Sequence, residues 1–335
     1  MDQPLPSDLT REQRRHLEDA RELWETWAPL TKRREALTGA VAWKTVKDRQ
    51  YLVRYWHDGD TGDKRMTSLG ARSPETEEAK LKFERDRVEV DRALANLKPR
   101  IDGLARVGRA LRVGRLETIA ADVLREVWRA DLLGTGLMIV GSAAIHLYEA
   151  SASVLVPQAI VPAGDLDLTI LHHSGPGVDD LARILRRADK TFRPVRDFAF
   201  ANADGFRVDV VPLDRMRSFY SSLGDLTSEQ HHVLDNALDL PPVHAVGVAR
   251  DGLPVPMAGL DPRSFSLLKY VRAEFDQDRT RNAAEIDRDQ AFAIGAIVAN
   301  YWRQEFDPEW LEAFPWLAEQ IGVASPEDRG PQFFM

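Results

Sequence analysis

The chain has 335 residues, enough for about two domains, and its 44% apolar content can form a sizeable core. Its 45 basic and 53 acidic side chains leave no apolar run near the roughly 18 residues of a membrane helix, so we expect no membrane partner. The first ten residues lack the basic start and apolar stretch of a secretion signal. No cysteine is present for a disulfide, a thiolate metal site or a thiol nucleophile, which agrees with a cytoplasmic protein.

The charge is unevenly distributed along the chain. Residues 1–130 hold 27 basic and 23 acidic side chains, whereas residues 131–335 hold 18 and 30. The basic excess is concentrated in residues 31–120, with 21 basic and 14 acidic side chains. Such an excess either attracts an anionic partner or belongs to a solvated helical face. We expect the two parts to have different functions.

Residues 1–130 have the pattern of a helical arm. Thr10 is a favoured N-cap residue, and apolar residues recur at helical spacing from there to about Pro29, where we expect the helix to end. Ser73 and Pro74, followed by acidic residues, predict the start of a long charged helix that Pro99 interrupts. Two further helices are expected over 101–111 and 119–128.

A β-hairpin is predicted within the arm. Tyr51, Val53 and Tyr55 alternate with their neighbours, and the pairs at 58–59 and 61–62 turn the chain toward a second strand over 65–70. Its aromatic and basic side chains would suit RNA, through stacking and phosphate contacts. Alternatively, the aromatic residues are one face of a packed hairpin. These side chains are Trp43, Lys44, Lys47, Arg49, Tyr51, Arg54, Tyr55, Trp56, Lys64 and Arg65.

Beyond Gly134, short apolar runs alternate with helical stretches, which is typical of an α/β layer. We expect strands at 137–140 and around 165–171, a hairpin of 196–201 with 206–211, and mainly helices from about 261. Helices are also expected over 143–152 and 178–190. The predicted domains are the arm (1–130), a catalytic core (131–260) and a C-terminal helical region (261–335).

Three carboxylates stand in predicted strands. Asp165 and Asp167 are two positions apart in an apolar strand, so both side chains lie on one face and repel each other. Asp209 lies in another apolar run, where a solvated strand edge is the alternative explanation. Three converging carboxylates would need a counter-charge, and an oxygen-only cluster suits Mg²⁺ or Mn²⁺.

A strand-to-helix turn at Gly141 and Ser142 is the second element of the pattern. Glycine permits close approach of a phosphate, and the amides that begin the next helix can bind an anion together with the Ser142 hydroxyl. A plain N-cap is the alternative, because serine is common at that position.

The order is strand, Gly-Ser, helix, Asp-x-Asp, and a third Asp on a later strand. It resembles the nucleotidyltransferase superfamily typified by DNA polymerase beta. Within it, the chain looks like bacterial nucleotidyltransferase-domain proteins related to the toxins of abortive-infection and toxin-antitoxin systems. The resemblance covers about residues 35–295 and includes the segments 136–150, 51–52, 68–70 and 73–77. One departure is the 22 positions between Ser142 and Asp165, which an inserted strand or loop at 154–161 would explain.

This resemblance implies an α/β (α+β) fold: a polymerase-beta-like core with a mixed sheet, an N-terminal arm of helices and a hairpin, and C-terminal helices. It implies that Gly141 and Ser142 hold the nucleotide phosphates. Asp165, Asp167 and Asp209 would bind two Mg²⁺ or Mn²⁺ ions, with Asp209 commonly deprotonating the acceptor.

In the toxin relatives a helical lysine, a following basic residue and an aspartate contact the nucleotide. Lys269, Arg281 and Asp287 match that order. The segment 285–289 offers more than one acid, and a surface role is the alternative for Lys269.

The expected activity is metal-dependent transfer of a nucleoside monophosphate from an NTP to a hydroxyl, with release of pyrophosphate (enzyme class 2.7.7). RNA, a tRNA end above all, is the favoured acceptor. A protein hydroxyl, another nucleotide or a small molecule such as an aminoglycoside stays open, as does an antitoxin partner. A catalytically silent nucleotide sensor and a structural scaffold are the alternatives of another class.

Overall fold

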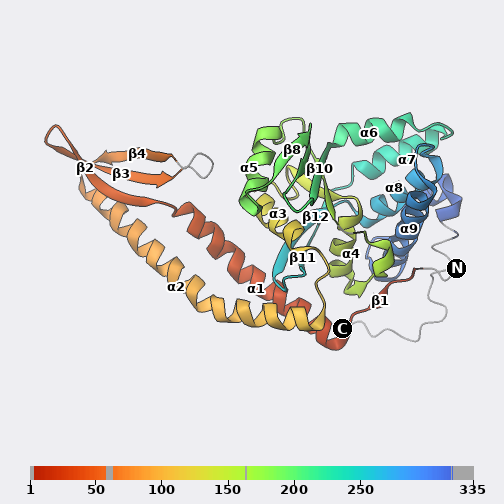
Figure 1. Cartoon of the computed structure of the whole chain (residues 1–335), viewed down its shortest axis with the longest axis horizontal. Coiled ribbons are helices and arrows are strands. Elements are labelled where there is room, and N and C mark those ends of the chain that lie inside the picture. Colours follow the sequence, from red (N-terminus) through yellow and green to blue (C-terminus); the bar gives the residue numbers. More distant parts are fainter. Residues whose placement is uncertain (1–3, 58–62, 163, 318, 320–335) are drawn as a thin grey trace. The chain divides into compact units, whose positions relative to one another are not determined.

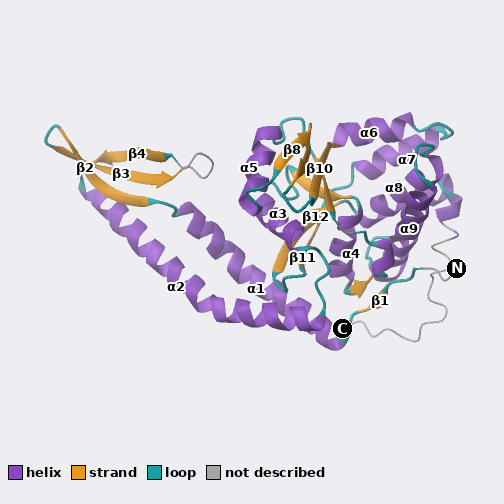
Figure 2. Ribbon diagram, viewed as in Figure 1, coloured by secondary structure: helices purple, strands orange, loops and turns teal. Residues whose placement is uncertain are grey.

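The computed structural model describes residues 4–57, 63–162, 164–317 and 319, so the predicted turn at 58–62 lies outside it. The chain divides into two compact units, residues 19–107 and residues 1–18 with 108–335. Figures 1 and 2 label the elements. The predicted three-domain boundaries stay predictions. None of the helices in the described part of the chain combines the length and apolar character that crossing a membrane requires.

The unit of residues 19–107 contains an antiparallel three-stranded sheet in the order β2-β3-β4. The β2–β3 turn is Lys47-Asp48, with φ of 47° and 60°, values typical of a tight type I′ turn. The sequence prediction missed β2, because this turn has no glycine to mark it. The strands are β2 (Ala40–Val46), β3 (Arg49–His57) and β4 (Lys64–Ala71).

Two long helices, α1 (Arg11–Ala36) and α2 (Pro74–Leu111), continue through Pro29 and Pro99, so the predicted breaks there were wrong. Ion pairs join the two helices just beyond each proline, from Arg33 to Asp86 at 3.5 Å and from Arg100 to Glu22 at 3.5 Å. Contacts with a neighbouring helix, which local sequence cannot show, keep each helix continuous although a proline removes one backbone hydrogen bond.

The other unit is built on a seven-stranded mixed sheet in the order β11-β12-β5-β7-β10-β9-β8. The central strand β7 is antiparallel to β5 and parallel to β10. The predicted α/β fold with a mixed sheet is therefore confirmed. Its strands are β5 (Leu137–Val140), β7 (Asp165–Ile170), β8 (Arg193–Arg196), β9 (Ala199–Ala201), β10 (Arg207–Pro212), β11 (Val243–Val248) and β12 (Pro254–Gly259). Strands β11 and β12 were not predicted.

Helices pack around this sheet, and the predicted helical C-terminal region is present. They are α3 (Thr118–Arg129), α4 (Ile145–Ala152), α5 (Val178–Ala188), α6 (Leu213–Ser222), α7 (Ser228–Leu238), α8 (Pro262–Phe275), α9 (Arg281–Tyr301) and α10 (Pro308–Ala313). In the segment expected to hold an insertion, the structure has β6 (Val154–Leu155), which pairs with β1 (Ser7–Asp8), and a 3₁₀ turn at Gln158–Ile160.

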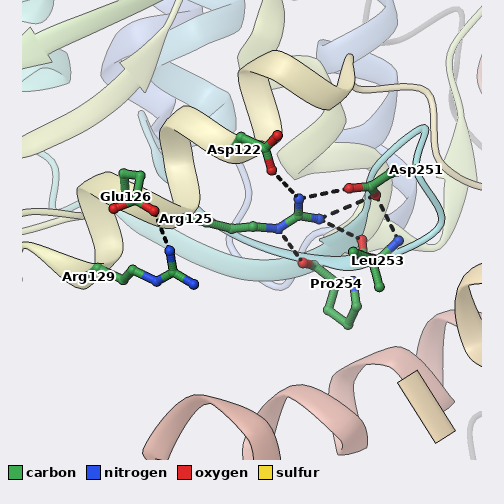
Figure 3. A network of polar contacts seen from close by, with 7 residues as sticks. All are labelled: Asp122, Arg125, Glu126, Arg129, Asp251, Leu253 and Pro254. Atoms are coloured by element: carbon green, nitrogen blue, oxygen red, sulfur yellow. Dashed lines mark hydrogen bonds and ion pairs between the residues drawn. The ribbon is translucent and has the colours of Figure 1, made fainter. Parts of the chain in front are cut away.

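A buried arginine ties α3 to the turn between β11 and β12 (Figure 3). The Arg125 guanidinium donates to both carboxylate oxygens of Asp251, at 2.8 and 3.3 Å, and to Asp122 at 2.8 Å. It also donates to the backbone carbonyls of Leu253 and Pro254. With its donors satisfied in this way, the charge of Arg125 is compensated inside the fold.

Candidate active site

The three aspartates of the sequence pattern lie on two neighbouring parallel strands. Asp165 and Asp167 stand on β7, and Asp209 on β10 is the register partner of Asp167. Side chains at paired positions of adjacent strands point to the same face. The structure therefore places the three carboxylates side by side at the start of the central strand.

The glycine turn lies directly against this cluster. Val140, the last residue of β5, pairs with Asp167, and Gly141 follows with φ of +66°. A Cβ atom at Gly141 would lie 2.2 Å from Asp167 Oδ2. Only glycine fits there, both because of the positive φ and because the carboxylate occupies the space of a side chain.

Asp165 and Asp167 carry uncompensated charge. In the described part of the chain, neither carboxylate has a hydrogen-bond or ion-pair partner. Burial, reinforced by Asp165 and Asp209, raises the pKa of Asp167 to about 6. Burial and Asp209 also raise the pKa of Asp165. Lys269 offsets part of both shifts, so a positive charge acts on the pair.

Asp209 differs because two arginines face it. Arg196 Nη2 lies 3.4 Å from Asp209 Oδ1, and Arg207 Nη2 lies 3.5 Å from Oδ2. Both arginine side chains are at least half exposed, so these long contacts are weak. Sequence reasoning missed both residues, although Arg207 stands two positions before Asp209 and must share its face of the strand.

Ser142 begins a 3₁₀ turn (Ser142–Ala144) that leads into α4. Its hydroxyl accepts a hydrogen bond of 3.0 Å from Gln290 Nε2, which also donates to the carbonyl of Ile160. Gln290 is fully buried on α9. It joins the Gly-Ser turn to α9 and to the segment between α4 and β7, a role that its place in the sequence does not signal.

A second charged group joins α8 and α9. Lys269 Nζ donates to Asp287 Oδ1 at 2.7 Å, and Arg279 contacts Asp287 Oδ2 at 2.7 Å. Asp287 is buried, and the Lys269 side chain is 11% exposed. Burial lowers the pKa of Lys269, against the opposing effect of Asp287.

Arg281 is placed apart from this group. Its side chain is 93% exposed and pairs with Glu285 on its own helix. The basic residue on Asp287 is instead Arg279, two positions earlier, which the spacing argument missed.

Whether the cluster suits a metal ion depends on its donors. Asp165 and Asp167 supply unpartnered carboxylate oxygens whose mutual repulsion a divalent cation would relieve, which fits Mg²⁺ or Mn²⁺. Within the described ranges, however, no three histidine or acidic side chains are grouped closely enough to hold a metal ion. Asp209, which faces the two arginines, is the candidate third ligand beside the pair.

Comparison with known proteins gives one finding. A family model described as nucleotidyltransferase matches residues 118–315, more than half of the chain, and this range contains the three aspartates, the glycine turn and the Lys269 group. No curated protein and no solved structure matches the chain.

Proposed function

The chain belongs to the nucleotidyltransferase family, and from this premise we propose that it transfers a nucleoside monophosphate from an NTP to a hydroxyl group, releasing pyrophosphate. One observation carries the proposal. Asp165, Asp167 and Asp209 lie side by side on β7 and β10, and Gly141 lies against Asp167. Unpartnered carboxylates beside a glycine turn are suited to a metal-bound triphosphate and have no structural purpose of their own.

In the proposed step the acceptor oxygen attacks the α-phosphorus of the NTP and Asp209 takes the hydroxyl proton. A new P–O bond forms while the bond from the α-phosphorus to the bridging oxygen breaks, and pyrophosphate leaves with that electron pair. Asp165, Asp167 and Asp209 would hold two Mg²⁺ or Mn²⁺ ions. When bound, such ions neutralise charge on the attacking and leaving oxygens.

The phosphates of the NTP would lie at the Gly141-Ser142 turn, which adjoins the carboxylate of Asp167. Lys269 supplies positive charge that already acts on Asp167. Asp287 positions Lys269 by holding its ammonium group, and the guanidinium of Arg279 pairs with the same carboxylate. We assign the second basic role to Arg279 and not to Arg281, which pairs with Glu285 in solvent.

RNA is the acceptor that we favour. Arg196 and Arg207 put positive charge beside the proposed base Asp209, where an acceptor that carries its own phosphates would approach. The resemblance to toxin-type enzymes points to a tRNA end. If that holds, expression of the active chain arrests bacterial growth, an inactive variant does not, and an antitoxin would be its natural partner.

The test incubates the protein with Mg²⁺, each α-³²P-labelled NTP and total RNA or lysate, beside Asp165→Asn/Asp167→Asn. Asp179→Asn, which changes an exposed acid on α5, is the matched control. We expect label in RNA with the wild type and the control only. Label in protein or in a small cationic product would show that the acceptor is that molecule and not RNA. Saturable NTP binding without pyrophosphate release would favour a silent sensor.

A further inference from the structure

The sheet of residues 19–107 is strongly basic. Its strands β2, β3 and β4 carry five basic side chains and no acidic one, namely Lys44, Arg49, Arg54, Lys64 and Arg65. This basic composition contrasts with the formal net charge of -8 for the whole chain. A surface of this kind attracts a polyanion.

Strand register separates the aromatic and basic residues into two faces. Paired residues of adjacent strands share a face, and Lys44 pairs with Tyr51 while Tyr55 pairs with Met66. Arg54, between the tyrosines, points the other way, where its guanidinium lies 5.6 Å from the centre of the Phe83 ring on α2. The face of Arg54 is therefore the one packed on α2.

The opposite side, which we call the open face, presents Lys44, Tyr51, Tyr55, Lys64 and Met66. Its contacts are made within the face. Lys44 Nζ lies 3.6 Å from Met66 Sδ, and Lys64 Nζ lies 4.5 Å from the centre of the Tyr55 ring. Met66 is 46% exposed and the tyrosines are half-buried. Neither lysine has a carboxylate partner among the residues that the structure describes.

We propose that the open face binds single-stranded RNA. Bases stack on Tyr51 and Tyr55, which lie roughly 13 Å apart along β3, and backbone phosphates contact Lys44 and Lys64. A duplex does not suit this face because its base planes are hidden in the helical stack. The packed-face explanation of the aromatic residues holds for the other side of the sheet.

The inference rests on the proposed function only in identifying this RNA with the acceptor. Binding is therefore measured apart from catalysis, with the full chain, a fluorescein-labelled 20-nucleotide RNA of mixed sequence, EDTA and no NTP. We expect Tyr51→Ala and Tyr55→Ala each to weaken binding about tenfold, and the Phe variants, which keep the ring, to bind like the wild type.

Salt dependence separates phosphate contacts from a change in folding. Each phosphate contact with single-stranded RNA contributes about 0.7 to the slope of log K against log salt concentration. Lys44→Gln/Lys64→Gln should lower that slope by about 1.4. The control Lys80→Gln/Lys98→Gln removes equal charge from lysines that already pair with acids on α2, and should leave it unchanged.

Three results would overturn the inference: an unchanged slope in Lys44→Gln/Lys64→Gln, equally tight binding of duplex RNA, or equal displacement by a polyglutamate peptide, which would indicate a general polyanion surface. Asp165→Asn/Asp167→Asn keeps the two proposals apart. That variant should bind RNA like the wild type. If the wild type binds RNA normally but transfers no NMP, the proposed function fails and the open face stands. If the wild type transfers an NMP to RNA and the open-face variants bind RNA as tightly as the wild type, the proposed function stands and the open-face proposal fails.

Discussion

Two charged clusters of the same structural unit differ in how their charge is balanced. The buried guanidinium of Arg125 is bonded on all sides to Asp122, Asp251 and two backbone carbonyls. Asp165 and Asp167 have no such partners in the described structure, and burial works against their ionisation. The first arrangement holds α3 to the β11–β12 turn, whereas the second is tolerated at a cost in stability. Uncompensated charge in a folded protein points to a ligand that is not part of the chain.

The largest expected effect tests the uncompensated cluster. Asp165→Asn/Asp167→Asn should lower nucleotidyl transfer by about 10⁴-fold, roughly 5.5 kcal/mol, because no divalent ion is then held at the phosphates. Its unfolding temperature without metal should equal or exceed that of the wild type. Transfer above a tenth of the wild-type rate would contradict the assignment, with Asp179→Asn as the control.

The compensated cluster should behave in the opposite way. Arg125→Met removes the buried guanidinium from the partly buried carboxylate of Asp251, and we expect the free energy of unfolding to fall by about 3–5 kcal/mol in urea denaturation. Transfer by the folded fraction should be unchanged. Lys98→Met removes the exposed partner of an exposed acid, Asp102, and should cost less than about 1 kcal/mol. Equal losses in the two variants would remove the distinction between the clusters.

How much of this site can be predicted from the sequence depends on how far apart in the chain the interacting residues lie. Asp165 and Asp167 must share a face because a strand has a period of two, so their proximity was readable from spacing alone. Asp209 lies beside Asp167 because β10 pairs with β7 in a particular register, which is a long-range property of the fold. The order of the elements suggested this pairing only through the family resemblance.

Other features could not be predicted from local sequence, because they depend on contacts between distant residues. The fold class followed from apolar runs and helical periodicity. Strand β2 was not predicted because the turn that follows it has no glycine. The helix breaks predicted at Pro29 and Pro99 were wrong because the contacts between α1 and α2 are formed by residues far apart in the sequence. Gln290 gives no signal of its own, since its two bonds join α9 to segments 130 or more residues earlier.

A smaller effect is expected at Asp287, whose carboxylate is shared by two cationic side chains. Asp287→Asn keeps the side-chain shape but removes the carboxylate charge that positions Lys269 and Arg279. We expect KM for the NTP to rise roughly tenfold, about 1.4 kcal/mol, with a smaller change in kcat. The exposed Glu285→Gln is the control. A kcat that falls with unchanged KM would show that Asp287 acts on the chemical step and not on nucleotide binding.

The uncompensated cluster also predicts a pH dependence of stability. Folding raises the pKa of Asp167 from 3.8 to about 6, so the folded state holds the proton more tightly and loses stability as pH rises from about 4 to about 6. Asp167→Asn lacks this loss. In EDTA its advantage in unfolding free energy should grow across that interval to about 1–2 kcal/mol and stay constant above it, as measured by urea titration at several pH values. An advantage that does not vary with pH would mean that the aspartate is ionised without cost.

The smallest effect is expected at Arg281, compared with its neighbour Arg279. At 100° per residue, positions 281 and 287 of α9 stand about 120° apart around the helix. Arg281 therefore does not face Asp287 and instead pairs with Glu285, four positions on. Arg279 lies before the helix, in a turn where its backbone N–H donates a hydrogen bond to the Asp276 carbonyl, and its side chain donates to Asp287. Arg281→Gln should leave KM for the NTP within twofold, while Arg279→Gln raises it several-fold. The reverse order would return the nucleotide contact to Arg281 and require α9 to begin differently when the NTP is bound.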